Sequence, residues 1–112
     1  MNRLNRTPHP LPVCRALLLL GFSGYGITRQ LRVHETAWEQ WRKGATPREV
    51  TRSGLILLAR RTLEAARSLA PRQPLLSQET LATAEVLVQE QESIWRTFSP
   101  VSLLRAEHHL SE

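Results

Sequence analysis

The stretch that decides the fold runs from Ser23 to Gly44 and reads SGYGITRQLRVHETAWEQWRKG. Ser23 is a favourable N-cap for a short helix over residues 24–31, and the residues around it have the spacing of a hydrophobic staple. A further short helix over about residues 35–43 ends at Gly44, which suits the left-handed position that follows a helix. Its start is open, because either His34 or a capping box of Thr36 with Glu39 can begin it. The stretch therefore predicts two short helices joined by a tight turn.

The residues on both sides of this stretch predict a disordered arm and two further helices, which extend to residue 70. Alternating prolines indicate a disordered basic arm over residues 1–12, since proline disfavours helix in the residue before it. A helix then begins near Pro12 and ends at Gly21. On the other side, Thr46 as cap and Pro47 as first helical residue predict a long helix to about residue 70, with Gly54 as a candidate break.

The C-terminal part predicts one more long helix. Ser77 caps it, it covers about residues 78–98, and its apolar side is one helical face: Leu81, Ala84, Val88, Gln91, Trp95 and Phe98. A linker over residues 71–74 precedes it, and a short helical turn follows from Ser99 to about residue 109. No segment alternates with a period of two, so the expected fold class is all-α.

The charge is divided unevenly along the 112 residues. The net charge is +5, with +9 over residues 1–72 and −4 over residues 73–112, and no Asp occurs. Such an asymmetry indicates a basic working face and an acidic tail, although the two ends can also neutralise each other. The arginines favour acidic partners, with nucleic acid before an anionic membrane surface.

Composition disfavours several other classes of protein. The single cysteine, Cys14, excludes a disulfide framework and a zinc site of four cysteines, and its apolar surroundings predict a buried structural thiol. Without Asp there is no Ser-His-Asp triad, and no glycine-rich phosphate loop occurs. We expect no catalysis, no cofactor and no metal. The apolar run over residues 16–22 is too short to span a membrane, and nearby prolines disfavour a signal peptide, so a cytoplasmic protein is expected.

The stretch over residues 23–44 resembles the helix-turn-helix of the Cro-type phage repressor family, also called the xenobiotic-response-element family. The positions that match are apolar: Ile27 and Leu31 in the first helix, Val33 after the turn, and Trp38 and Trp41 in the second helix. Four positions depart from the family pattern, which usually has Gln at 24, Ala at 28, Gly at 32 and an acidic residue at 42. This chain has Gly24, Thr28, Arg32 and Arg42 there. The resemblance covers about residues 13–70.

This resemblance implies that the second helix lies in the major groove of DNA, held there by the first. The face opposite the two tryptophans then reads bases, with candidates Glu35, Thr36, Glu39 and Gln40. The flanking cations suit phosphates: Arg29, Arg32, Arg42, Lys43, Arg48 and Arg52. The two carboxylates count against this face, because phosphate repels them, although Glu39 can pair with Lys43.

The expected organisation is a disordered basic arm (1–12), a helix-turn-helix DNA-binding domain (13–70) and a C-terminal helical segment (75–110). That last segment either forms a dimer contact or completes the monomer core. The expected function is a sequence-specific transcriptional regulator, a repressor that binds double-stranded DNA at a palindromic operator as a homodimer, with no membrane partner. The alternative is an adaptor or antitoxin-like interaction module without nucleic-acid binding, which docks through Trp95, Phe98, Leu103 and Leu104.

Overall fold

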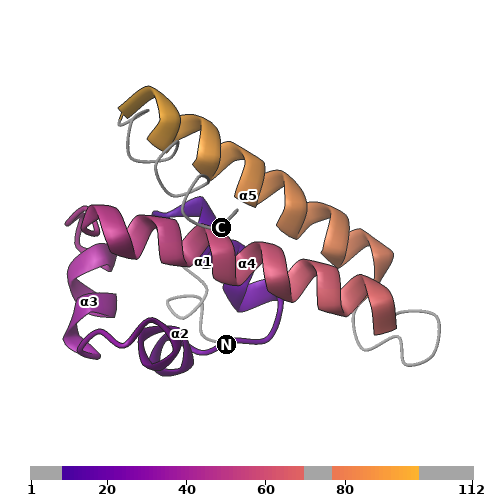
Figure 1. Cartoon of the computed structure of the whole chain (residues 1–112), viewed down its shortest axis with the longest axis horizontal. Coiled ribbons are helices and arrows are strands. Elements are labelled where there is room, and N and C mark those ends of the chain that lie inside the picture. The colour runs from indigo at the N-terminus through magenta and orange to yellow at the C-terminus, as the bar shows by residue number, and fades with distance from the viewer. Residues whose placement is uncertain (1–8, 70–76, 99–112) are drawn as a thin grey trace, which may run out of the picture.

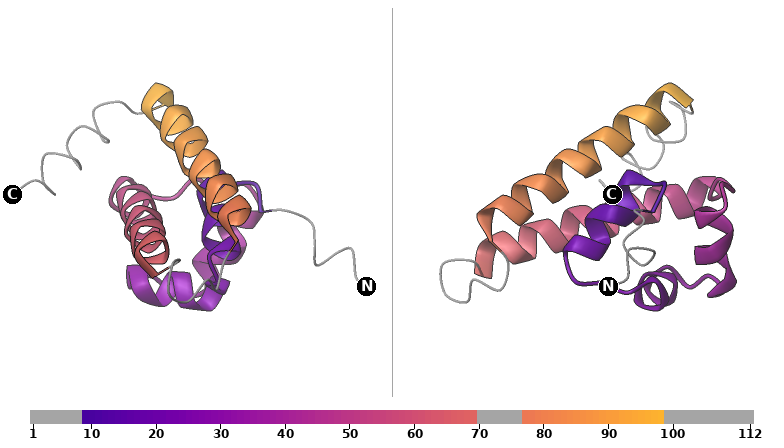
Figure 2. Two further views of the ribbon diagram at one scale, coloured as in Figure 1. Left: turned by 90° about the vertical axis from the view of Figure 1, so that its right-hand side faces the viewer. Right: turned by 180° about the vertical axis from the view of Figure 1, so that it is seen from behind.

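A computed structural model describes residues 9–69 and 77–98 of the chain. This part contains five helices and no strand, so the all-α class is confirmed (Figure 1). The helices are α1 (Pro12–Leu19), α2 (Gly24–Leu31), α3 (Thr36–Arg42), α4 (Glu49–Leu69) and α5 (Gln78–Phe98). The two long helices, α4 and α5, lie alongside each other, while α2 and α3 lie near the end where α4 begins (Figures 1 and 2).

The short helix α1 lies at the centre of the core. Its side chains Val13, Cys14, Ala16 and Leu17 are fully buried, because α4 and α5 pack on it from different sides. Pro12 at the first helical position and Gly21 at positive φ beyond the end bound it as expected from the sequence.

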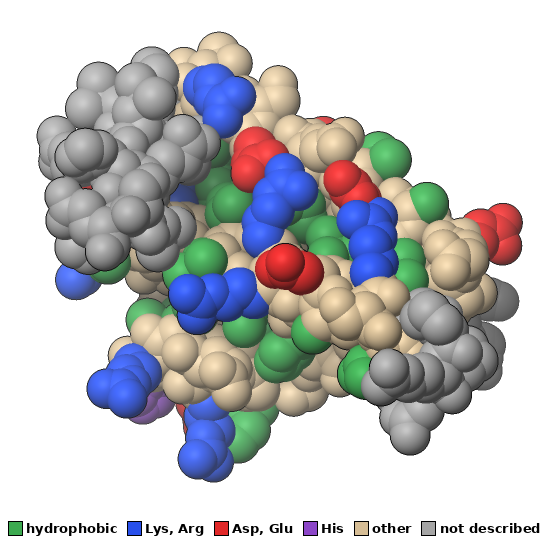
Figure 3. Space-filling view, turned by 45° about the vertical axis from the view of Figure 1, so that its right-hand side comes forward, with side chains coloured by type: hydrophobic (Ala, Val, Ile, Leu, Met, Phe, Trp, Pro, Cys, Tyr) green, Lys and Arg blue, Asp and Glu red, His purple; other side chains and the backbone are tan. Residues whose placement is uncertain are grey.

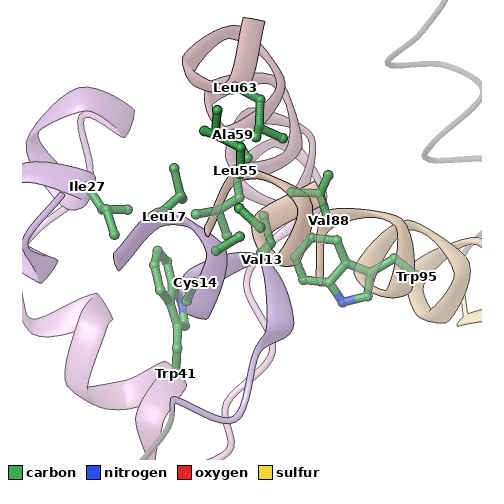
Figure 4. Close-up of a cluster of buried hydrophobic side chains, with 13 residues drawn as sticks. Val13, Cys14, Leu17, Ile27, Trp41, Leu55, Ala59, Leu63, Val88 and Trp95 are labelled. Atoms are coloured by element: carbon green, nitrogen blue, oxygen red, sulfur yellow. The ribbon is translucent and has the colours of Figure 1, made fainter. Parts of the chain in front are cut away.

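Helix α5 completes this core. Leu81, Ala84, Val88 and Trp95 are buried together with apolar residues of α1 and α4 (Figure 4). Of the two roles expected for the C-terminal segment, the structure therefore has the second, in which α5 folds back onto the rest of the chain. The interpretation of Trp95 as a docking residue is wrong, since this side chain is only 3% exposed.

A buried hydrogen bond fixes how α5 meets α1. The backbone N–H of Val13 donates to Oε1 of Gln91 over 3.1 Å, and the Gln91 side chain is fully buried. This N–H belongs to the first turn of α1, where no helical carbonyl is available to accept it. The polar residue on the apolar face of α5 thus provides the hydrogen-bond acceptor for a backbone N–H at the start of α1.

The start of α4 differs from the sequence prediction by two residues. The helix begins at Glu49, not at Pro47, and the N–H of Arg52 donates to the carbonyl of Arg48 over 2.8 Å. Pro47 is buried, and its carbonyl accepts from the Arg52 guanidinium over 2.8 Å. Pro47 therefore belongs to the loop that packs under the helix.

The helix α4 also runs through Gly54 without a break. A Cβ atom at Gly54 would lie 2.9 Å from Cδ2 of Leu31 in α2. This glycine lets α2 approach α4 closely, so the expected break is wrong for a packing reason.

The last residues of the expected disordered arm belong to the folded part of the protein. His9 is buried and its Nδ1 accepts the N–H of Leu11 over 3.1 Å, while its carbonyl accepts from the Arg15 guanidinium over 2.8 Å. Residues 9–11 are therefore part of the folded domain, because a histidine ring fills a space beside Trp38. The remainder of the arm, the linker at 71–74, the turn after Ser99 and the side chain of Phe98 lie outside the described residues.

Candidate nucleic-acid interface

Helix α2 begins as the sequence predicts. The Ser23 hydroxyl oxygen accepts the N–H of Gly26 over 2.9 Å, and Ile27 is fully buried. Thr28 is also buried, but its hydroxyl donates to the carbonyl of Tyr25 over 3.0 Å, so the polar group is satisfied within the helix. A threonine at this position therefore does not prevent close packing.

The turn after α2 contains an arginine in the left-handed region. Arg32 has φ 58° and ψ 41°, and no other non-glycine residue of the described part has a positive φ. The turn is closed by the N–H of Val33, which donates to the carbonyl of Thr28 over 3.0 Å. The arginine side chain is exposed. The left-handed backbone conformation of Arg32 therefore does not push its side chain into the core.

Helix α3 begins at Thr36, between the two starts that the sequence left open. Nδ1 of His34 accepts the N–H of Thr36 over 3.1 Å, so the histidine side chain provides an acceptor for the backbone N–H of the first helical residue. Gly44 follows the helix with φ 108°, which is the expected left-handed end.

Two tryptophans fix α3 on the rest of the protein. Trp41 is 5% exposed and lies beside Cys14 and Leu17 in the core (Figure 4). Trp38 lies with its ring centroid 4.5 Å from that of His9 and 6.2 Å from that of Trp41. A Cβ atom at Gly24 would lie 2.7 Å from the Trp38 ring, so only glycine lets α2 approach α3 in this way.

The four candidate base-reading residues are brought together on the outer side of α3. Glu35, Thr36, Glu39 and Gln40 are all exposed. Glu39 pairs with Arg42, with 3.5 Å between Oε2 and Nε, and not with Lys43 as expected from the sequence. The pair lies one helical turn apart and leaves Thr36 and Gln40 on the same face.

The six candidate phosphate-binding cations fall into two groups. Arg29 lies over the Tyr25 ring, Arg42 pairs with Glu39, and Arg52 donates to the carbonyl of Pro47. The side chains of Arg32, Lys43 and Arg48 make no ion pair or hydrogen bond with the described residues. These three side chains are exposed around α3, so they are available to an acidic partner.

Further along α4 the positive charge is largely neutralised within the fold. Arg60 pairs with Glu92 of α5, and Arg67 pairs with Glu85 of the same helix. Figure 3 shows basic and acidic side chains next to each other on this side of the molecule. The acidic tail expected from the sequence is therefore partly a neutralising face, and the unpaired charge gathers near α3.

A groove that sequence reasoning missed opens beside the same region. Its volume is about 860 Å³, and it lies between the end of α2 with the turn that follows, α3, and one face of α4. We call it the α4 groove. On the α4 side its lining includes Val50, Gly54, Leu57, Leu58 and Arg61. No periodicity along one helix predicts such a groove, because it depends on how far α3 stands away from α4.

Two titratable side chains of the described residues, His9 and Cys14, are buried. Burial lowers the pKa of His9 to about 4, and the positive charge of Arg42 acts in the same direction. Burial also raises the pKa of the Cys14 thiol to about 12, which agrees with the structural thiol expected from the sequence.

No three His, Cys, Asp or Glu side chains of the described part lie close enough together to hold a metal ion. None of the described helices combines the length and the apolar character that a membrane span needs. Comparison with protein-family models, with curated proteins and with solved structures gave no match.

Proposed function

We propose that the protein is a sequence-specific DNA-binding regulator in which α2, the turn and α3 form a helix-turn-helix. The observation that carries the proposal is the left-handed conformation of Arg32 at the position where the resembled family has glycine. A left-handed residue at this position supports the proposal, because a glycine in the turn of the resembled motif can adopt the same conformation without cost. Around it, the inward positions Ile27 and Trp41 are buried, as a recognition helix held on its partner requires.

The surface chemistry supports the same proposal. Thr36 and Gln40 are exposed side chains that can contact a thymine methyl group and an adenine edge. Arg32, Lys43 and Arg48 surround them without partners among the described residues, and such cations bind phosphate oxygens. Pairing with Arg42 reduces the repulsion that Glu39 exerts on DNA.

The proposed mechanism is repression by occlusion of a promoter, with a two-fold dimer on a palindromic operator. The inner face of α5 is occupied by the core, so the dimer contact uses another surface. Light scattering of the protein with and without operator DNA measures this part of the proposal separately. A single protein copy on an intact operator contradicts the dimer and leaves DNA binding in place.

The base-reading face is tested with two alanine variants. Oligonucleotides bound from a random pool define the operator, and fluorescence anisotropy then measures affinity for it. We expect Thr36→Ala and Gln40→Ala each to weaken specific binding by about 1–3 kcal/mol, as the loss of a base contact does. Both side chains are exposed, so thermal stability is expected to stay unchanged.

Matched controls lie on α5, outside the candidate nucleic-acid interface. Thr83→Ala and Gln89→Ala change the same residue types at exposed positions of α5 and are expected to leave the affinity unchanged. If the α3 variants bind as tightly as these controls, the assignment of the reading face is wrong. If no sequence is enriched and binding to heparin does not depend on salt, the interaction-module alternative replaces the proposal.

A further inference from the structure

The α4 groove has the length of a helical peptide. Its residues on α4 extend from Val50 to Arg61. Eleven steps of about 1.5 Å give a length of about 17 Å along the helix axis. Val50, Gly54 and Leu57 follow each other at spacings of four and three, so the lining is one continuous face of α4. A partner of three to four helical turns covers such a face, whereas a small ligand leaves most of it in water.

The floor of the groove is apolar and incompletely covered. Val50 is 75% exposed, and Leu57 and Leu58 are half-buried. On the opposite wall, Leu31 and Val33 are also half-buried. Exposed apolar side chains that line one concave surface are typical of a binding groove.

The rim of the groove is positively charged. Its lining holds the arginines Arg32, Arg48 and Arg61, and it contains no Asp or Glu. These three are the described arginines whose side chains have no interaction with other described residues. All the others interact within the fold, as Arg60 does with Glu92. The arginines that the fold leaves unpaired among the described residues therefore line this groove, while the unpaired Lys43 lies outside its lining.

We propose that the α4 groove binds an acidic amphipathic helix of a partner protein. The apolar side of such a helix covers the leucines, and its carboxylates pair with the three arginines. DNA fits this surface less well, because a phosphate backbone brings no apolar group to Val50 or Leu57. Gln40 and two of the candidate phosphate-binding arginines also line the groove. The partner is therefore expected to exclude DNA, a consequence that rests on the proposed function.

The groove is tested without DNA, with random 16-residue peptides displayed on phage. We expect enriched peptides to carry Leu or other large apolar residues at spacings of three and four, with Glu or Asp between them. Fluorescence anisotropy of a synthetic enriched peptide then measures affinity. Val50→Glu and Arg61→Glu are each expected to weaken binding by about tenfold or more. The first places a carboxylate against the apolar side of the peptide, and the second places one against a peptide carboxylate.

A matched control is Val86→Glu, which changes an exposed valine of α5 that is 59% exposed and outside the groove lining. This variant is expected to bind the peptide as the unchanged protein does. Equal loss in Val86→Glu, enrichment of basic or uncharged peptides, or no enrichment overturns the proposal. A synthetic peptide of residues 99–112 that binds the groove as tightly as the enriched peptide assigns the groove to the chain itself and also overturns it.

Competition with DNA is measured separately. An enriched peptide is expected to displace operator DNA from the protein in proportion to its occupancy of the groove. Peptide binding that leaves DNA affinity unchanged overturns the exclusion of DNA, while the groove assignment stands on the phage experiment. A protein that binds peptide but no DNA at all contradicts the proposed function alone.

Discussion

Residue 24 shows how a missing side chain sets the relation between two helices. Gly24 opens α2, where alanine has the better helix propensity by about 1 kcal/mol. The Trp38 ring occupies the space that a Cβ atom would need, at 2.7 Å. An indole is rigid and is held by His9 and Trp41, so it does not yield as an aliphatic side chain would.

We therefore expect Gly24→Ala to destabilise the protein by about 1 kcal/mol or more. The helix propensity of alanine alone would have the opposite effect. Urea denaturation of the variant measures this loss. The same substitution in a Trp38→Leu background is the control, because a leucine leaves room for the methyl group. There the sign is expected to reverse, and a loss of the same size in both backgrounds would show that contact with Trp38 is not the cause.

His9 gives the fold a dependence on pH. Its pKa falls from 6.5 to about 4 on folding, so the unfolded chain binds more protons between these two values. The stability from the neutral ring is complete above about pH 6.5 and is lost as the pH falls toward 4. The total effect is on the order of 3 kcal/mol, at about 1.4 kcal/mol for each pKa unit.

Denaturation curves of the wild type and of His9→Phe over pH 4–7 measure this effect. Phenylalanine keeps a ring beside Trp38 but does not titrate, so the variant is expected to lose less stability as the pH falls. All other residues are the same in the two proteins, so their contributions to the pH dependence cancel in the difference. Curves that run parallel over the whole range would rule out His9 as the source of the pH dependence.

At the scale of helices, Gln91 determines how α5 sits on α1. Its position on an otherwise apolar face looks like a defect until the N–H of Val13 is considered. We expect Gln91→Leu to destabilise the protein by about 1–3 kcal/mol, because it leaves this buried N–H without an acceptor. The control is Gln89→Leu at an exposed position of the same helix. Equal denaturation midpoints of the two variants would show that the hydrogen bond contributes nothing.

The helix starts show what the sequence could predict and what it could not. Ser23 and Ser77 both accept the N–H three residues on, as their positions predict, because such a cap depends only on neighbouring residues. The pair of Thr46 with Pro47 gave a start two residues too early, since Pro47 is drawn into the loop by tertiary packing. Gly54 was misread for the same reason, because its close neighbour Leu31 belongs to another helix.

In the candidate site too, the features that depend on one helix could be predicted from the sequence, and those that depend on contacts between helices could not. The exposed face of α3 follows from the spacing of Trp38 and Trp41 within one helix, so its residues could be proposed from the sequence. Which arginines are free could not be predicted. The partners Glu85 and Glu92 lie in α5, 18 and 32 residues beyond Arg67 and Arg60. The α4 groove was missed because it lies between segments whose distance no local pattern fixes.

At the scale of the whole molecule, a helix of the acidic half of the chain completes the core of the basic half. Without α5, fully buried residues of α1 such as Val13 and Cys14 would lose one side of their packing. Arg60 and Arg67 would lose their partners as well. We therefore expect a chain that ends after Gln73 to be unfolded, with no cooperative transition in circular dichroism on heating. The loss of apolar burial exceeds what a small domain can tolerate.

A chain that ends after Phe98 is the control for this truncation. It is also shorter than the full protein, but it keeps all five described helices and is expected to unfold cooperatively. If the chain ending after Gln73 unfolds cooperatively too, the basic half is a domain of its own and α5 is an added layer. In that case light scattering of the truncated chain measures whether two copies associate through the face of α1 that α5 normally covers. A dimer of the truncated chain would show that this face can make a dimer contact, so the role of α5 would again be open between core and dimer contact.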